Sequence, residues 1–136
     1  MKTISPNEIV CERVLEPADQ GEKITLRISK PKKDRHGDWK CDFQIQGLGD
    51  DEIKAAHGID SMQAITVAIQ AIRAFLTKSG RELTWEGGEK GDIGMPFEIP
   101  AYLPLPQRNR IEQVVKEEID RFVLKHKSKL AKRTIK

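Results

Sequence analysis

The stretch Gly58-Ile59-Asp60-Ser61-Met62-Gln63-Ala64 predicts the start of a long helix. Asp60 is a favourable N-cap residue, because its carboxylate accepts hydrogen bonds from the free N–H groups of the first helical turn. Gln63 follows three residues later, the position from which a side chain reaches back to the N–H group of the cap. We therefore expect the helix to begin at Ser61.

Apolar residues continue from this start at helical spacing, which indicates one face turned toward a core. The apolar stripe consists of Met62, Ile65, Ala68, Ile69, Ile72, Phe75 and Leu76. Lys78 suits the negative end of the helix dipole, and Gly80 is the expected left-handed residue beyond the last turn. These signals predict one helix over residues 61–79.

The chain before this helix alternates apolar and polar residues in two segments, as half-buried strands do. In residues 23–30 the inward side chains are those of Ile24, Leu26 and Ile28. In residues 39–46 the expected inward set is Trp39, Cys41, Phe43 and Ile45, and the expected wet face carries Lys40, Asp42, Gln44 and Gln46. The polar connector between the segments predicts an antiparallel hairpin.

Weaker signals lie on both sides of this hairpin and of the helix. Residues 7–15 are typical of a first strand, and residues 51–57 of an edge strand with Ile53 and Ala55 facing inward. Residues 83–85 are short and β-prone, while Pro96 limits residues 93–99 to an edge strand at best.

A second helical pattern begins at Gln107. Its apolar residues are Ile111, Val114, Val115, Ile119, Phe122 and Val123. Strands followed by a helix, a short strand and a second helix indicate the α+β class. We predict an antiparallel sheet of about four strands with the long helix packed across it, plus a C-terminal amphipathic helix.

Length and composition favour one cytoplasmic domain over residues 1–136. No run of about 18 apolar residues is present, so we expect no membrane partner. The N-terminus lacks an apolar signal region, and only two cysteines occur, which together indicate a reducing compartment.

Charge is distributed unevenly along the chain. Residues 125–136 hold six basic and no acidic side chains, which leaves 18 basic and 21 acidic residues in positions 1–124. A basic end of this kind is either a frayed, solvated helix terminus or an arm that binds anions. Candidate nucleic-acid contacts in this tail are Lys127, Lys129, Lys132 and Arg133.

Three short patterns in the chain resemble an uncharacterised bacterial family of domains of unknown function. They are W-x-C-x-F-x-I-x-G over residues 39–47, G-x-D-S-x-Q-A over residues 58–64 and L-T-W-x-G-G over residues 83–88. The resemblance covers roughly residues 22 to 99 and implies a bacterial, cytosolic origin. It implies no catalytic residue, because the function of the family is unknown, and the motif positions all have folding roles.

Few residue types in the chain suit catalysis. His36 lies between Asp34 and Asp38, an arrangement that is more often a polar turn than a metal site. His57 could act as a base beside Asp60, but a histidine at a strand end is the commoner case. Cys41 falls on the apolar face, which favours a buried thiol over a nucleophile. We therefore expect no enzymatic activity, metal or cofactor.

The absence of a chemical constellation favours a binding module. We expect a small cytosolic protein that binds another protein, as an immunity or antitoxin partner of a toxin with a basic domain. The acidic turn Asp50-Asp51-Glu52 is the candidate contact for such a partner. The alternative is a nucleic-acid-associated protein that uses its Lys-rich tail for phosphate contacts.

Overall fold

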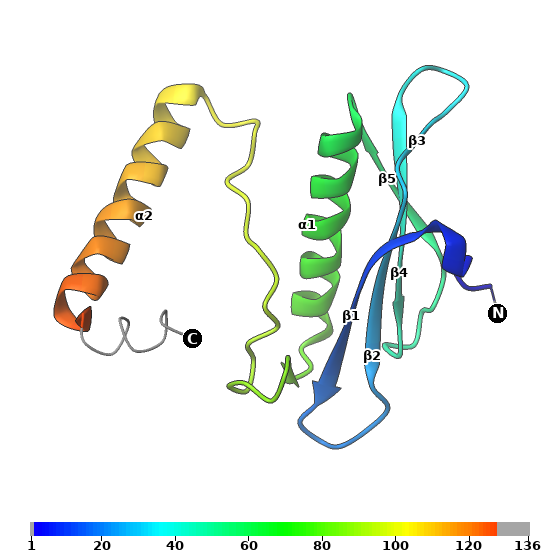
Figure 1. Cartoon of the computed structure of the whole chain (residues 1–136), viewed down its shortest axis with the longest axis horizontal. Coiled ribbons are helices and arrows are strands. Elements are labelled where there is room, and N and C mark those ends of the chain that lie inside the picture. Colours follow the sequence, from blue (N-terminus) through cyan, green and yellow to red (C-terminus); the bar gives the residue numbers. More distant parts are fainter. Residues whose placement is uncertain (1, 128–136) are drawn as a thin grey trace. The chain divides into compact units, whose positions relative to one another are not determined.

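The computed structural model describes residues 2–127, and it divides into two compact units, residues 1–97 and 98–136. The prediction of one domain over residues 1–136 stays a prediction. Unit 1 contains the sheet and the long helix, and unit 2 contains the second helix (Figure 1). This confirms the α+β class.

Unit 1 is built on an antiparallel sheet whose six strands lie within the described residues. Its strands are β1 (Ile9–Pro17), β2 (Ile24–Ser29), β3 (Lys32–Lys33), β4 (Trp39–Gln46), β5 (Lys54–Gly58) and β6 (Leu83–Thr84). β4 pairs with β2, β3 and β5, and β1 pairs with β2 and β6. A short 3-10 helix, Pro6–Glu8, precedes β1.

The expected count of about four strands is therefore wrong, and two short strands account for the difference. Pro31 lies between β2 and β3, and its missing N–H interrupts what would otherwise continue as one strand. β6 contributes only Leu83 and Thr84, which pair with the end of β1. Residues 93–99 form no strand.

Helix α1 (Ser61–Ser79) has the predicted bounds and packs across one face of the sheet (Figure 1). The Asp60 carboxylate accepts a hydrogen bond from the Gln63 N–H at 2.8 Å, and Gly80 is left-handed with φ 68°. The Gln63 side chain reaches back as expected, although its oxygen accepts from the Ile59 N–H at 2.6 Å and not from that of Asp60. The Gln63 side chain thus bonds to the backbone one residue before the predicted position.

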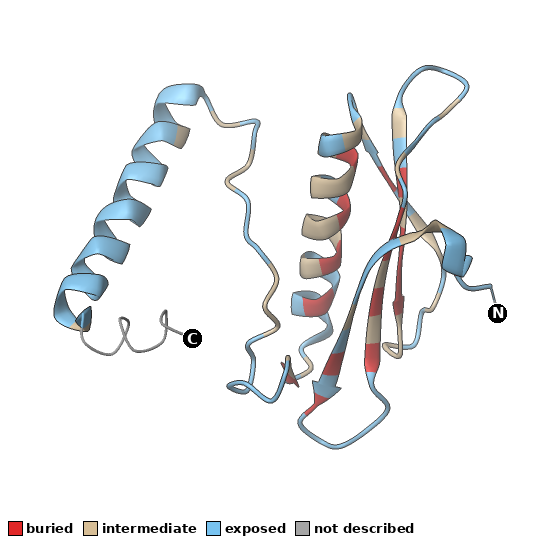
Figure 2. Cartoon of the chain, in the orientation of Figure 1, coloured by how far each residue is buried: buried red, intermediate tan, exposed pale blue. Residues whose placement is uncertain are grey.

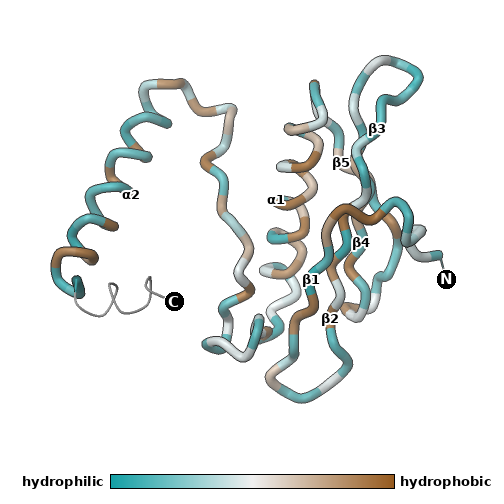
Figure 3. The backbone as a smooth tube through the Cα atoms, in the orientation of Figure 1, coloured by the Kyte–Doolittle hydropathy of each residue, from teal (hydrophilic) through white to brown (hydrophobic). Residues whose placement is uncertain are grey.

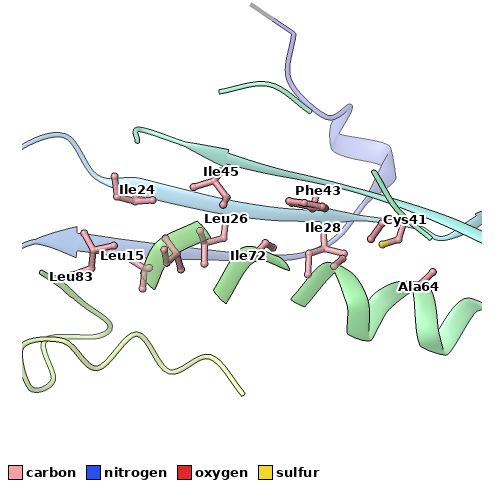
Figure 4. Close-up of a cluster of buried hydrophobic side chains, with 13 residues drawn as sticks. Leu15, Ile24, Leu26, Ile28, Cys41, Phe43, Ile45, Ala64, Ile72 and Leu83 are labelled. Carbon is pink, nitrogen blue, oxygen red and sulfur yellow. The ribbon is translucent and has the colours of Figure 1, made fainter. Parts of the chain in front are cut away.

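The core lies between α1 and the sheet, where burial concentrates (Figure 2; Figure 4). Leu15, Ile24 and Ile72 are completely buried there, and Ala64 and Ala68 let the helix approach the sheet closely. Close approach also requires Gly58, because a Cβ atom at that position would lie 2.5 Å from the Ala64 nitrogen. The assignment of Met62 to the buried stripe is wrong, since 74% of its surface is exposed.

Two strand predictions are wrong, one about which residue faces inward and one about burial. On β5, Ala56 is buried and Ala55 exposed, because Ala56 pairs with the inward-facing Cys41. On β4, Gln44 belongs to the face away from α1 but is fully buried. The N-terminal segment covers it, and Ile4 in that segment is itself buried.

Gln44 satisfies its own hydrogen bonds by joining three parts of unit 1. Its side-chain oxygen accepts from the Ile4 N–H at 3.3 Å. Its side-chain nitrogen donates to the Lys2 carbonyl at 3.0 Å and to the Asp51 carbonyl at 2.8 Å. The N-terminal segment, β4 and the loop before β5 are therefore tied together by one buried amide.

Residues 93–97 are held against unit 1 without strand pairing. Arg13 donates to the Gly94 carbonyl at 2.6 Å, and its guanidinium lies 4.0 Å from the centroid of the Trp85 ring. Gln70 donates to the Pro96 carbonyl at 3.0 Å. Gly94 has φ 66° and fits closely against Trp85, since a Cβ atom would lie 2.3 Å from Trp85 Cε3.

Unit 2 consists of an extended segment followed by α2 (Leu105–Lys125). The helix begins two residues before the predicted start, with Pro106 in its first turn, where a missing N–H costs nothing. No residue of α2 is buried (Figure 2). Within the described residues, no helix is long and apolar enough to cross a membrane.

Candidate functional site

The acidic turn Asp50-Asp51-Glu52 lies in the loop between β4 and β5, and its three residues have different roles. Asp51 supports the loop, since its carboxylate accepts from the Gly47 N–H at 3.0 Å and its carbonyl from Gln44. The Asp50 carboxylate accepts from the Glu52 N–H at 3.1 Å and pairs with Lys54 at 2.9 Å. The hydrogen bond from Lys54 lowers the pKa of Asp50 below its ordinary value.

A hollow of about 260 Å³ lies between this loop and the C-terminal end of α1. Its apolar lining comes from Phe43, Ile45, Leu48 and Phe75. The Phe43 and Phe75 rings are 6.3 Å apart and tilted, and Lys54 Nζ lies 5.4 Å from the centroid of the Phe75 ring. The hollow is large enough for one or two apolar side chains.

Charged side chains at this hollow come from both the loop and the helix. Asp50, Glu52, Lys54 and Lys78 all contribute to its lining. Asp50 and Lys54 pair with each other, whereas Glu52 and Lys78 make no ion pair within residues 2–127. An unpaired acid and an unpaired base beside an apolar hollow offer both contact area and charge recognition to a ligand.

The prediction that Asp50, Asp51 and Glu52 contact a partner stays a prediction. Asp50 and Glu52 line the hollow, whereas Asp51 holds the loop through its hydrogen bond from Gly47. The residues that sequence reasoning missed are Leu48, Phe75 and Lys78. Phe75 was placed in the core stripe of α1, but 41% of its surface is exposed. Its position at the edge of that stripe was the only sequence signal that it is partly exposed.

A second hollow of about 260 Å³ lies between the N-terminal segment and the outer face of the sheet. Its two carboxylates already have partners, since Glu8 pairs with Lys32 at 3.1 Å and Asp42 with Lys40 at 3.5 Å. This hollow therefore presents fewer free acidic groups than the one beside Glu52.

The basic tail is only partly within the described residues. Lys127 is exposed just beyond α2. Lys129, Lys132 and Arg133 lie outside the described residues. Their predicted role as phosphate contacts stays a prediction.

The remaining chemical candidates are not brought together. Asp34 accepts from the N–H groups of His36 and Asp38 at 2.8 and 3.1 Å, which makes this tip a polar turn. Residues 2–127 contain no group of three or more metal-ligating side chains. His57 is exposed on β5, and the Asp60 carboxylate is engaged in the helix cap.

The two cysteines do not form a reactive pair. Cys11 lies on β1 and Cys41 on β4, and β2 separates the two strands. Burial raises the pKa of the Cys41 thiol to about 11, with a smaller contribution from Asp42. Its thiol lies 3.2 Å from the Ser29 carbonyl and donates to it. Cys41 is therefore a neutral core residue at physiological pH.

Comparison with known proteins gives one match. Residues 11–97 match a family described as a domain of unknown function (DUF6968). No curated protein and no solved structure matches the chain. The match ends at Phe97, which is also the last residue of unit 1.

Proposed function

The chain belongs to this family of domains of unknown function, and on that premise we propose that it is a protein-binding module. The observation that carries the proposal is the hollow beside Glu52, where apolar and unpaired charged side chains meet. Interfaces between proteins combine these features, since an apolar centre supplies affinity and the charges at its edge supply orientation.

The proposed partner is a protein segment with an apolar side chain next to a lysine or arginine. The apolar side chain packs between Leu48 and Phe75, and the basic group pairs with Glu52. The acidic excess of positions 1–124 favours a partner with a basic surface, because opposite net charge accelerates association. A toxin domain that acts on nucleic acid has such a surface, so the finer proposal is a bacterial, cytoplasmic immunity or antitoxin protein.

We also propose that α2 is amphipathic. Hydrophobic residues recur between hydrophilic ones along the helix (Figure 3). At 100° per residue the hydrophobic ones other than Leu124 fall within one half of the helix circumference. Arg108, Glu112 and Glu118 fall in the same half. The apolar side consists of Leu105, Ile111, Val115, Ile119, Phe122 and Val123, with Val114 at its edge. Such a helix is stable when a second surface covers its apolar side.

The experiment is co-purification from the native host with the full-length chain as bait. Glu52→Lys is the test variant, because it reverses the free charge at the hollow. Glu22→Lys is the matched control, because it makes the same change at an exposed position in the turn between β1 and β2. We expect Glu52→Lys to weaken capture of the partner about tenfold and the control to leave it unchanged.

Two further arms separate the protein-binding proposal from the nucleic-acid alternative. A bait that lacks residues 127–136 and a lysate treated with nuclease should both retain the protein partner. If the full-length bait recovers only nucleic acid, or loses every protein partner in either arm, the nucleic-acid proposal replaces this one. The immunity proposal adds a separate expectation: the captured partner inhibits growth when expressed alone, and this chain relieves the inhibition.

A further inference from the structure

The apolar side of α2 has no covering element within its own unit. Between residues 98 and 127, α2 is the only helix and no strand occurs. Half or more of the surface of Val114, Ile119 and Phe122 is exposed, at 55%, 55% and 53%. The helix is about 31 Å long, at 1.5 Å per residue, which is sufficient for an extended helix–helix contact.

The two ends of the apolar side of α2 are equally far from Val114. The apolar side begins at Leu105 and ends at Val123, and Val114 lies midway between them. Two copies of the helix that run antiparallel about Val114 therefore place Leu105 of each copy level with Val123 of the other. In this register the two ends of the apolar side lie opposite each other.

The charges beside the apolar side suit the same register. At 100° per residue, Glu112 and Lys116 lie on one flank, and a two-fold axis brings the same flanks of the two copies together. Glu112 of one copy is then level with Lys116 of the other, and this pair occurs twice. Within one copy neither residue makes an ion pair in the described part of the chain, where the pair on α2 joins Arg121 and Glu118.

A second set of opposite charges comes level in this register. Glu118 lies on the opposite flank, where it pairs with Arg121 of its own helix. Arg110 of the second copy comes level with Glu118 of the first, although Arg110 lies farther from the contact. A parallel, in-register pair would instead bring opposite flanks together, and it would not place Glu112 of one copy beside Lys116 of the other.

We propose that two copies of this chain associate through α2, antiparallel about Val114, with Glu112 of each copy against Lys116 of the other. The partner is a second copy because this register brings the two ends of the apolar side level with each other and places Glu112 and Lys116 of the two copies opposite one another. This inference does not depend on the function proposed for the hollow, because it is tested on the purified chain alone.

The first experiment measures the mass of the full-length protein over a range of concentrations by analytical ultracentrifugation. We expect a concentration-dependent equilibrium between monomer and dimer. Ile119→Asp places a charge on the apolar side and should remove the dimer. Leu124→Asp makes the same change opposite the apolar side, at a residue 80% exposed, and should leave the dimer intact.

Charge exchange then tests the register. Glu112→Lys alone and Lys116→Glu alone each place like charges opposite one another and should raise the dimer Kd about tenfold. The double variant Glu112→Lys/Lys116→Glu restores two opposite pairs and should return the Kd to near its original value. Circular dichroism of each variant checks that the helix is retained.

Three results would overturn the proposal. A chain that stays monomeric at all concentrations shows that another surface covers α2, whether unit 1 or a different protein. A dimer that Ile119→Asp leaves unchanged forms elsewhere. A dimer weakened by both single exchanges and not recovered by the double variant has a different register.

Discussion

At the scale of single residues, the buried groups on β4 give the sharpest expectations. Gln44 makes three hydrogen bonds to backbone groups in two other segments. Gln44→Leu leaves those groups without partners, so we expect a loss of about 2 to 3 kcal/mol in the free energy of unfolding. Denaturation in urea measures it. Gln107→Leu, at an exposed site, should change stability by less than about 0.5 kcal/mol.

Cys41 predicts a pH dependence. Burial raises the pKa of its thiol from 9.0 to about 11, so the folded state keeps a proton that the unfolded chain releases. The resulting stability is fully present below pH 9 and is lost as the pH rises through about 11. Between these values the free energy of unfolding should fall more steeply for the wild type than for Cys41→Ala. Equal slopes would show that the thiol is accessible to water.

At the scale of elements, the start of α1 depends on one carboxylate. Asp60→Ala removes the acceptor of the Gln63 N–H and should lower the free energy of unfolding by about 1 kcal/mol. Asp60→Asn keeps a side-chain oxygen there and should retain most of the stability. Thermal melting of both variants checks the expectation, and identical melts for wild type and Asp60→Ala would contradict the cap.

The elements also show which parts of the fold were predictable. The bounds of α1 and β4 followed from local signals, namely a cap, a left-handed glycine and strict alternation. Gln44 and Ala56 were misassigned because their burial depends on segments distant in sequence, the N-terminal segment and the pairing with Cys41. Alternation specifies two faces of a strand, but not that a second segment covers the outer face.

The candidate site was less predictable than the fold for the same reason. The acidic turn is visible in the sequence, but Lys78 is 26 residues from Glu52 and joins it only through the packing of α1. Asp51 was indistinguishable from its neighbours because its hydrogen bond to Gly47 depends on the path of the loop. The local sequence pattern thus located the loop side of the hollow and missed the side formed by α1.

At the scale of the whole molecule, the extended segment at the start of unit 2 should be the site of first cleavage. Tyr102 is 85% exposed, and no helix or strand includes it. Brief chymotrypsin treatment should cut after Tyr102 and leave a fragment that contains all of unit 1. Mass spectrometry identifies the site, and Tyr102→Ser should slow the cleavage. Early cuts within β1 or α1 would contradict the division at Phe97.

The common end point of unit 1 and of the family match at Phe97 has an evolutionary consequence. Every buried apolar residue of the described chain lies at or before Leu83. Substitutions after Phe97 therefore leave those positions untouched, and the α2 segment can change, or be exchanged for another, while the ancestral core is inherited intact. Related chains can then share unit 1 and differ in the segment that follows it. A chimaera that joins unit 1 of this chain to the C-terminal segment of a relative at Phe97 should therefore keep the stability of unit 1 and acquire the oligomeric state of that relative.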